Sequence, residues 1–236
     1  MRRLAVILAL SLSSMLSFAQ SEPEYLMEIG AGAGVMSYLG DFNGSIVKNM
    51  QPSASLVLRR MFNPRQGLKL QIGYGKMKGS SADVKTTYPE IPTPGYKPEG
   101  TEEYYAFNNN LFDLGVTYEY NFWPFGTGRE YRGAKRITPF IFGGLGMTYV
   151  NGSNTSAFAF KLPLGVGVKF KVSARCNLNL DWTINFTTSD KLDGVEDPYG
   201  IKRSGLFKNA DCYSALMVSF TYSFMEKCRV CHNQDE

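Results

Sequence analysis

Along most of the chain, apolar and polar residues alternate, which is the pattern of strands whose two faces meet different surroundings. The alternation is clearest in Cys176–Thr187, where every second residue from Leu178 to Phe186 is apolar and the residues between them are asparagine, aspartate or threonine. The pattern predicts eight strands, over Tyr25–Met36, Ala54–Phe62, Leu68–Tyr74, Asn110–Phe122, Thr138–Val150, Ala157–Val172, Cys176–Thr187 and Ala210–Phe224.

Most of these strands are long enough to cross a bilayer at a tilt, which takes ~9–11 residues. An apolar face opposite a polar, glycine-bearing face is the pattern of a wall between lipid and lumen. A spanning sheet has to close, because an open edge in lipid would leave backbone groups unpaired. The sequence therefore predicts an all-β fold, a small closed antiparallel transmembrane β-barrel of about eight strands over residues 20–225. An exported soluble β-sandwich is the alternative, and it explains the number of strands but not their length.

The predicted connections fit this topology if the mature N-terminus lies in the periplasm. Long loops are then outside, over residues 37–51, 76–107 and 188–209, with a shorter one over 151–156. The connections 63–67 and 173–175 are short, as periplasmic turns of such barrels are. The segment 123–137 is the exception, a long periplasmic connection.

The first residues are predicted to be a signal peptide, residues 1–19. Arg2 and Arg3 form a positive start, Leu4–Leu12 an apolar run too short to span a bilayer, and Ser17-Phe18-Ala19 a cleavage site. Export places the protein in the bacterial outer membrane, where lipid is a partner. Without Arg2 and Arg3 the chain has 23 basic and 21 acidic residues, so no nucleic-acid partner is expected.

The interior of the predicted barrel carries charges of both signs. An eight-stranded barrel is filled by its own side chains or holds at most one small ligand, and buried opposite charges usually pair. We therefore expect a lumen closed by ion pairs rather than a diffusion pore. The inward-facing candidates are Glu28, Lys69, Asp113, Glu119, Lys161, Lys169, Lys171, Asp181 and Asp211.

Catalytic and cofactor chemistry has little support in the sequence. The single histidine, His232, lies beyond the last predicted strand, so a nucleophile and its base would meet only if the tail folded back. Gly30-Ala31-Gly32-Ala33-Gly34 lacks the spacing and the following helix of a nucleotide loop, and is better explained as tight packing on an inward strand face. No catalytic residue, metal or cofactor is predicted, and the protein is not expected to be an enzyme.

All four cysteines lie in the last quarter of the chain, and two of them are in the tail, residues 226–236. Cys176 and Cys212 begin neighbouring antiparallel strands at opposite ends, too far apart to bridge. Cys228 and Cys231 are the candidate disulfide residues. They could bond to each other, to a partner protein, or remain thiols. With His232 they also match the haem-attachment pattern, but the tail offers no pocket and no second ligand.

The long periplasmic connection is strongly basic. Its cationic residues Arg129, Arg132, Lys135 and Arg136 are either a solvated turn or a docking patch for an acidic partner surface. Together with the cysteine tail, they place the distinctive chemistry of the chain on the periplasmic side.

Four segments of the chain carry a further signal, namely Tyr38–Phe42, Ile137–Gly146, Leu162–Lys169 and Thr187–Val195. The run Thr187–Val195, which includes Ser-Asp-Lys-Leu-Asp-Gly, is the most specific of them. The glycine-rich segments are less specific, since many barrels contain them. In these segments the chain resembles PorG-like outer-membrane proteins of the type IX secretion system in Bacteroidetes.

The resemblance implies a non-enzymatic role in protein secretion. PorG-like proteins contact the periplasmic ring of the machine, which is built from a PorK-like lipoprotein and a PorN-like soluble protein. An intermolecular disulfide from the tail to such a partner is a further expectation. The alternative function is a general structural or adhesive barrel that acts through its outer loops, above all the loop over 76–107.

Overall fold

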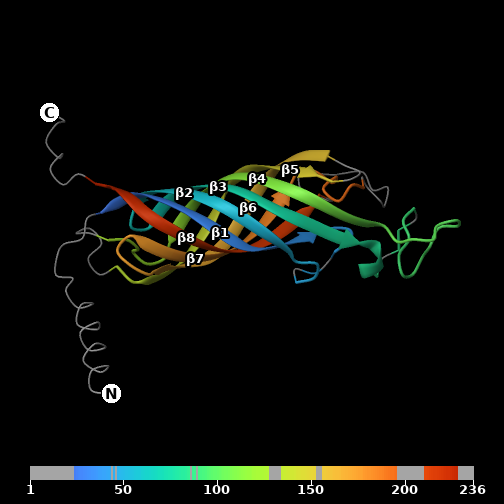
Figure 1. Ribbon diagram of the computed structural model, residues 1–236, viewed down its shortest axis with the longest axis horizontal. Helices are drawn as coiled ribbons and strands as arrows, with labels where there is room; N and C mark the ends of the chain where they lie inside the picture. Colours follow the sequence, from blue (N-terminus) through green and yellow to red (C-terminus); the bar gives the residue numbers. More distant parts are fainter. Residues whose placement is uncertain are drawn as a thin grey trace, which may run out of the picture.

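The chain folds into one closed β-barrel (Figure 1) in the computed structural model, which describes residues 24–43, 45, 47–85, 87–88, 90–127, 134–152, 156–195 and 210–227. Each strand pairs antiparallel with the next, and the last pairs with the first, so the predicted fold class is confirmed. The strands are β1 (Tyr25–Leu39), β2 (Gln51–Asn63), β3 (Gln66–Ser80), β4 (Ala106–Asn121), β5 (Ile137–Asn151), β6 (Ser156–Lys171), β7 (Cys176–Thr187) and β8 (Cys212–Glu226).

The two faces of the wall differ as the alternation predicts. On β7, Leu178, Leu180 and Trp182 face outward and are 39–46% exposed, whereas Asn177 and Asn179 face the lumen and are fully buried. The same apolar exposure runs along the outside of the other strands. A belt of this extent belongs in lipid rather than water, and the protein is a bacterial outer-membrane β-barrel. The described residues contain no helix long and apolar enough to cross a membrane.

Glycines allow the seam between β1 and β8 to close tightly. A Cβ atom on Gly34 would lie 2.0 Å from the backbone oxygen of Leu216, and one on Gly30 would lie 2.1 Å from that of Phe220. Backbone cannot move aside as a flexible side chain can, so only glycine fits at these points. The interpretation of Gly30–Gly34 as inward packing rather than a nucleotide loop is therefore confirmed.

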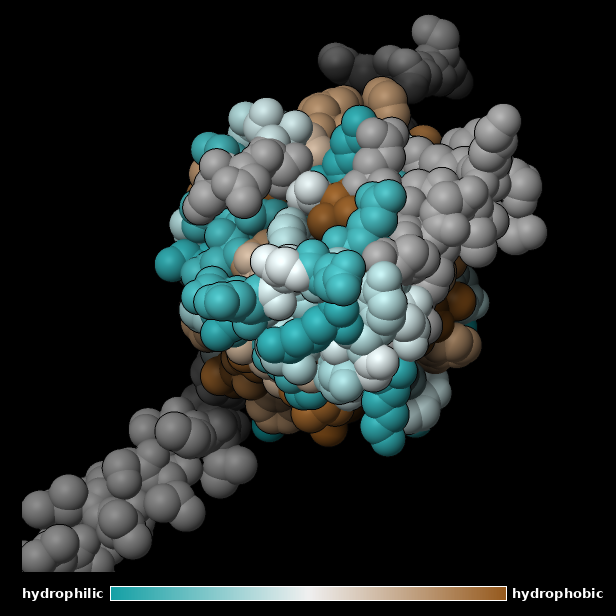
Figure 2. All heavy atoms as spheres, turned by 90° about the vertical axis from the view of Figure 1, so that its right-hand side faces the viewer, coloured by the Kyte–Doolittle hydropathy of each residue, from teal (hydrophilic) through white to brown (hydrophobic). Residues whose placement is uncertain are grey.

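The two ends of the barrel differ in their connections. β1 begins and β8 ends at the same end of the barrel, which is also the end with the short turns between β2 and β3 and between β6 and β7. By the rule for such barrels this end is periplasmic. The opposite, extracellular end carries the long loops, and Figure 2 shows it as a largely hydrophilic surface.

The hairpin of β3 and β4 is longer than the sequence analysis predicted. β3 continues to Ser80 and β4 begins at Ala106, so the predicted loop over 76–107 shrinks to 81–105. The prediction failed because the outward residues of this extension, such as Lys76 and Lys78, are charged. They lie beyond the lipid, where the apolar-out pattern no longer applies. The hairpin therefore projects past the rest of the barrel (Figure 1).

Candidate functional site

Buried ion pairs fill the periplasmic half of the lumen, with Glu119 of β4 at their centre. Arg59 Nε lies 2.8 Å and Lys169 Nζ 2.6 Å from Glu119 Oε2, and Lys69 Nζ lies 3.6 Å from Oε1. Arg59 also pairs with Glu28, and Lys69 with Asp181 at 3.7 Å. Three cations and three carboxylates from six strands thus neutralise one another. These ion pairs connect the strands of the wall across the lumen.

Sequence reasoning predicted five of these six charges and missed Arg59. The signal was present, because Val57, Arg59 and Met61 are all inward and buried. The neighbouring Arg60, which points outward, obscured the alternation. Lys171 lies at the periplasmic mouth, with its Nζ 5.1 Å from the centre of the Phe125 ring.

A second polar layer lies closer to the extracellular end. Lys161 Nζ is 2.9 Å from Asp113 Oδ1, and the Tyr213 hydroxyl donates to the same oxygen at 2.6 Å. Thr148 Oγ1 donates to it as well, at 2.5 Å. The expected closure of the lumen by opposite charges is therefore found at two levels.

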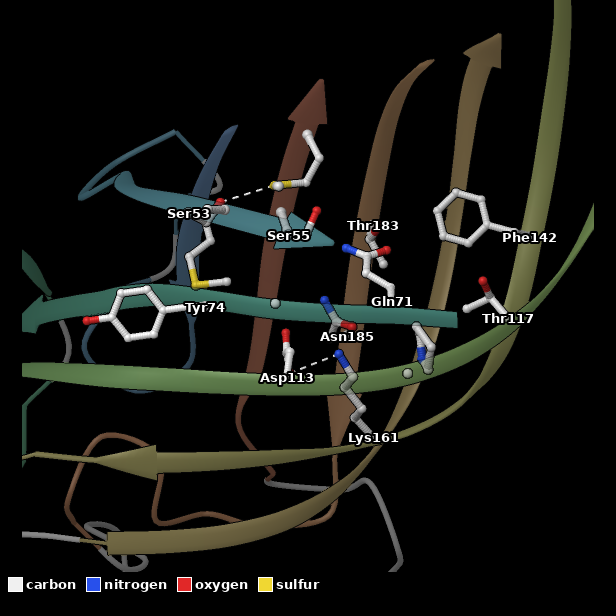
Figure 3. Close-up of a pocket in the computed structure, with 17 residues that line it drawn as sticks. Ser53, Ser55, Gln71, Tyr74, Asp113, Thr117, Phe142, Lys161, Thr183 and Asn185 are labelled. Atoms are coloured by element: carbon white, nitrogen blue, oxygen red, sulfur yellow. Dashed lines mark hydrogen bonds and ion pairs between the residues drawn. The ribbon is translucent and has the colours of Figure 1, made fainter. Parts of the chain in front are cut away.

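A small cavity of about 40 Å³, lined by both polar and apolar side chains, borders the second layer (Figure 3). Lys161 and Asp113 border it, and Gln71 and Asn185 also line it. The hydroxyls of Ser55 and Thr117 line it as well, and both are buried without a protein partner. A cavity of this size accommodates a few water molecules.

The connection between β4 and β5 is fixed to the periplasmic end of the barrel at both of its stems. Phe125 is buried, and its backbone N–H donates to the carbonyl of Pro64 at 3.0 Å. Thr138 Oγ1 lies 3.1 Å from both the N–H and the carbonyl of Trp123. On the far stem, Lys171 N–H donates to the carbonyl of Arg136 at 2.8 Å. The described stems of the connection, residues 122–127 and 134–136, are therefore fixed to the periplasmic end of the barrel.

Two of the four predicted docking residues lie in the described part of this connection, and they are exposed. The Lys135 ammonium lies 4.2 Å from the centre of the Trp123 ring, and Arg136 follows it directly. Arg129 and Arg132 lie outside the described residues. The structure thus places Lys135 and Arg136 on the periplasmic surface, while their role stays a prediction.

Positive charge dominates the described part of the periplasmic rim. Outside the ion-paired interior, the two acidic residues described at this end are Glu24 and Glu226, and each lies in an ion pair, with Lys227 at 3.3 Å and Arg175 at 3.0 Å. The described basic residues of the rim are Arg60, Arg65, Lys135, Arg136, Lys171, Arg175 and Lys227. This rim therefore attracts acidic groups.

The cysteines fall at both ends of the barrel. Cys176 and Cys212 carry free thiols, and their register partners Tyr222 and Phe186 place them at opposite ends of the β7–β8 pair. The prediction that they do not bridge is therefore confirmed. Cys228, Cys231 and the predicted signal peptide lie outside the described residues. No group of three or more metal-binding side chains comes together within the described part of the chain.

Comparison with protein families gives a match over almost the whole sequence. The model of the family described as "Domain of unknown function (DUF6089)" matches residues 2–233. The chain belongs to this family. The description of this family names no activity. The comparison with curated proteins found no match to this chain.

Solved outer-membrane barrels resemble this DUF6089 chain at low identity. A major outer membrane protein from Thermus thermophilus is 15% identical with a TM-score of 0.48, over 84% of this chain and 98% of that one. Neisserial surface protein A is 13% identical with a TM-score of 0.47, over 84% and 97%. The outer membrane enzyme PagL is 12% identical with a TM-score of 0.38, over 82% and 97%. Such identities do not indicate a shared activity.

Proposed function

We propose that the protein is an outer-membrane structural component of the type IX secretion machinery, which docks the periplasmic ring to the outer membrane. The sequence resemblance to PorG-like proteins motivates this function. The basic periplasmic rim is the observation that carries it, because it gives the barrel a surface suited to an acidic protein partner. The partners in this proposal are the PorK-like lipoprotein and the PorN-like protein of the ring.

The lumen supports a role at the surfaces of the barrel rather than inside it. Two layers of paired charge cross the interior, around Glu119 and around Asp113. A solute would have to break several buried ion pairs to pass, so transport through the barrel is disfavoured. The described residues also lack a histidine, and we infer that the protein is not an enzyme.

The fixed stems of the β4–β5 connection support its use as the docking element. An anchored segment loses less conformational entropy on binding than a free loop, so more of the contact energy remains as affinity. Lys135 and Arg136 lie on the anchored far stem, and the sequence places Arg129 and Arg132 shortly before it, outside the described residues. We therefore assign the ring contact to residues 128–136 and the surrounding rim.

An adhesive or structural barrel is the second candidate, and the protruding hairpin favours it. Beyond β3, Tyr96 and Tyr104 are 41% and 38% exposed on a loop held by a two-residue turn at Pro94–Gly95. Exposed tyrosines on an ordered loop are common in binding surfaces. This function would leave protein secretion unaffected when the hairpin tip is removed.

Deleting the gene in its host separates the two candidates. A docking component is needed for export, so cargo of the secretion machine should accumulate inside the cells while the outer membrane stays intact. The measurement is a quantitative blot of cargo in medium and cell fractions, with a complemented strain as control. Normal export in the deletion strain would exclude the secretion role.

The tail offers a covalent test of the partnership. On non-reducing gels of native outer membranes we expect a heavier band that collapses on reduction and is missing in a Cys228→Ser, Cys231→Ser variant. A Cys176→Ser variant is the matched control and should keep the band. Mass spectrometry of the band would identify the partner. Monomer alone in every lane would contradict the intermolecular disulfide and leave docking to the basic rim.

A further inference from the structure

The extracellular mouth is covered by a packed layer of loops. The ring of Phe42, from the loop after β1, lies 5.5 Å from that of Tyr88 and 6.3 Å from that of Phe107, measured between centroids. All three are buried, and Leu192 from the loop after β7 is fully buried in the same cluster. The mouth is therefore closed by a hydrophobic cover rather than by open loops.

The segment 188–195 is attached to this cover by a small number of polar contacts. The side-chain amide of Asn109 donates to the carbonyl of Leu192 at 2.8 Å, and the Tyr105 hydroxyl donates to the carbonyl of Asp193 at 2.7 Å. Leu192 N–H donates to Asp211 Oδ2 at 2.9 Å. Because Asp211 directly precedes β8, it lies at the mouth and not in the wall, where the sequence analysis had placed it.

One tyrosine hydroxyl joins two carboxyl groups at the centre of these contacts. Tyr38 Oη of β1 lies 2.7 Å from Asp193 Oδ2 and 2.5 Å from Asp211 Oδ1, and all three residues are at most 2% exposed. The remaining oxygen of each carboxyl accepts a backbone N–H, from Val195 and from Leu192. The two acids are thus held together on a single hydroxyl.

Counting hydrogens gives the protonation state of this arrangement. A tyrosine hydroxyl carries one hydrogen and can donate it to one acceptor at such short distance. The second short oxygen–oxygen contact needs another hydrogen, which has to be on a carboxyl group that donates to the hydroxyl oxygen. With both acids ionised, two buried negative charges would share one donor. The closed geometry therefore contains one protonated carboxyl.

The surroundings add negative charge to the pair. Burial, together with Asp41 of the loop after β1 and Asp190 of the same segment, raises the pKa of Asp193 to about 7. Burial and the charge of Asp193 raise the pKa of Asp211. The other titratable groups nearby are Tyr38, Tyr105 and the exposed Lys191.

We propose that segment 188–195 is a proton-dependent lid over the extracellular mouth, held closed by a proton that Asp193 and Asp211 share through Tyr38. In the open lid both carboxyls reach water and regain an ordinary pKa of about 3.9. The closed state then binds more protons than the open one. Proton binding therefore stabilises the closed lid fully below about pH 4, and this stabilisation is lost as the pH rises through about 7. Within that window the closed-to-open ratio falls by up to tenfold per pH unit.

Opening the lid would uncover the upper polar layer of the lumen. Tyr38 pairs with Tyr213 in the β1–β8 register, and Tyr213 contacts Asp113 and Lys161. The inference concerns the extracellular end alone and does not depend on the secretion role.

Hydrogen–deuterium exchange of the full-length protein in lipid nanodiscs tests the lid. After correction for the intrinsic pH dependence of exchange, we expect the peptide covering 188–195 to be at least tenfold less protected at pH 8 than at pH 5. In Asp193→Asn the carboxamide supplies a donor that does not titrate, so the pH difference should disappear. Glu103→Gln, in an exposed loop, is the control and should behave as the native chain.

Heat-modifiable gel migration shows whether each variant has reached the folded barrel. If Asp193→Asn does not fold, Asp211→Asn carries the same prediction. Equal protection at both pH values in the native protein, or an unchanged pH response in the folded Asn variant, would overturn the proposal. Restored protection at pH 8 on adding calcium would also overturn it, because a cation rather than a proton would then neutralise the pair.

Discussion

Reversing the charge of Arg129, Arg132, Lys135 and Arg136 to glutamate is expected to reduce cargo export to the level of the gene deletion. The change converts a basic docking segment into an acidic one, and like charges facing each other across an interface cost several kcal/mol. Loss of about 4 kcal/mol corresponds to roughly a thousandfold weaker binding. The measurement is secreted cargo in the medium together with co-purification of the ring proteins.

A matched variant makes this result specific to the periplasmic side. Lys76, Lys78, Lys85 and Lys97 are four exposed basic residues at the extracellular end. Their reversal to glutamate changes the net charge equally and should leave export at the native level. Equal loss of export in both variants would point to an effect on folding or on net charge. Native export in the variant with the reversed periplasmic residues would exclude a docking role for residues 128–136.

Replacing Glu119 by glutamine is expected to destabilise the barrel by about 3–5 kcal/mol, the usual cost of removing one partner from a buried ion pair. Glu119 is fully buried and contacts Arg59, Lys69 and Lys169. Glutamine keeps the shape but removes the charge, which leaves these three cations facing Glu28 and Asp181 alone. Urea unfolding in detergent micelles, followed by tryptophan fluorescence, measures the effect.

The control is Glu103→Gln, which removes the same charge from an exposed loop and should change the unfolding free energy by less than about 0.5 kcal/mol. A Glu119→Gln barrel that unfolds at the native urea concentration would mean that the lumen network contributes little to stability. The two tryptophans, Trp182 on the outer wall and Trp123 on the β4–β5 connection, are unchanged in both variants, so both variants report through the same probes.

The wall of the barrel could be predicted from the sequence because the side on which each residue points is set within its own strand. On β7 and β6 each side chain meets either lipid or lumen, and period-two alternation records that choice residue by residue. The same alternation identified Glu119, Lys69 and Lys169 as inward charges, and opposite signs in a narrow lumen implied that they pair.

The features that the sequence left open depend on contacts between distant segments. The extension of β3 to Ser80 follows from pairing with β4, since its charged outward face carries no lipid signal. Arg59 differs from these features, because the alternation of β2 does place it inward and the outward Arg60 obscured that signal.

The sequence by itself determined the all-β class, the number of strands, the membrane-facing side and the sign of the lumen charges, because each of these is encoded in alternation within one strand. Only the tertiary structure decided that Tyr38, Asp193 and Asp211 meet at the mouth, since the two aspartates lie 155 and 173 residues from the tyrosine along the chain. Closure of β8 onto β1 brings them together, and no local pattern marks a contact whose partners are set by that closure.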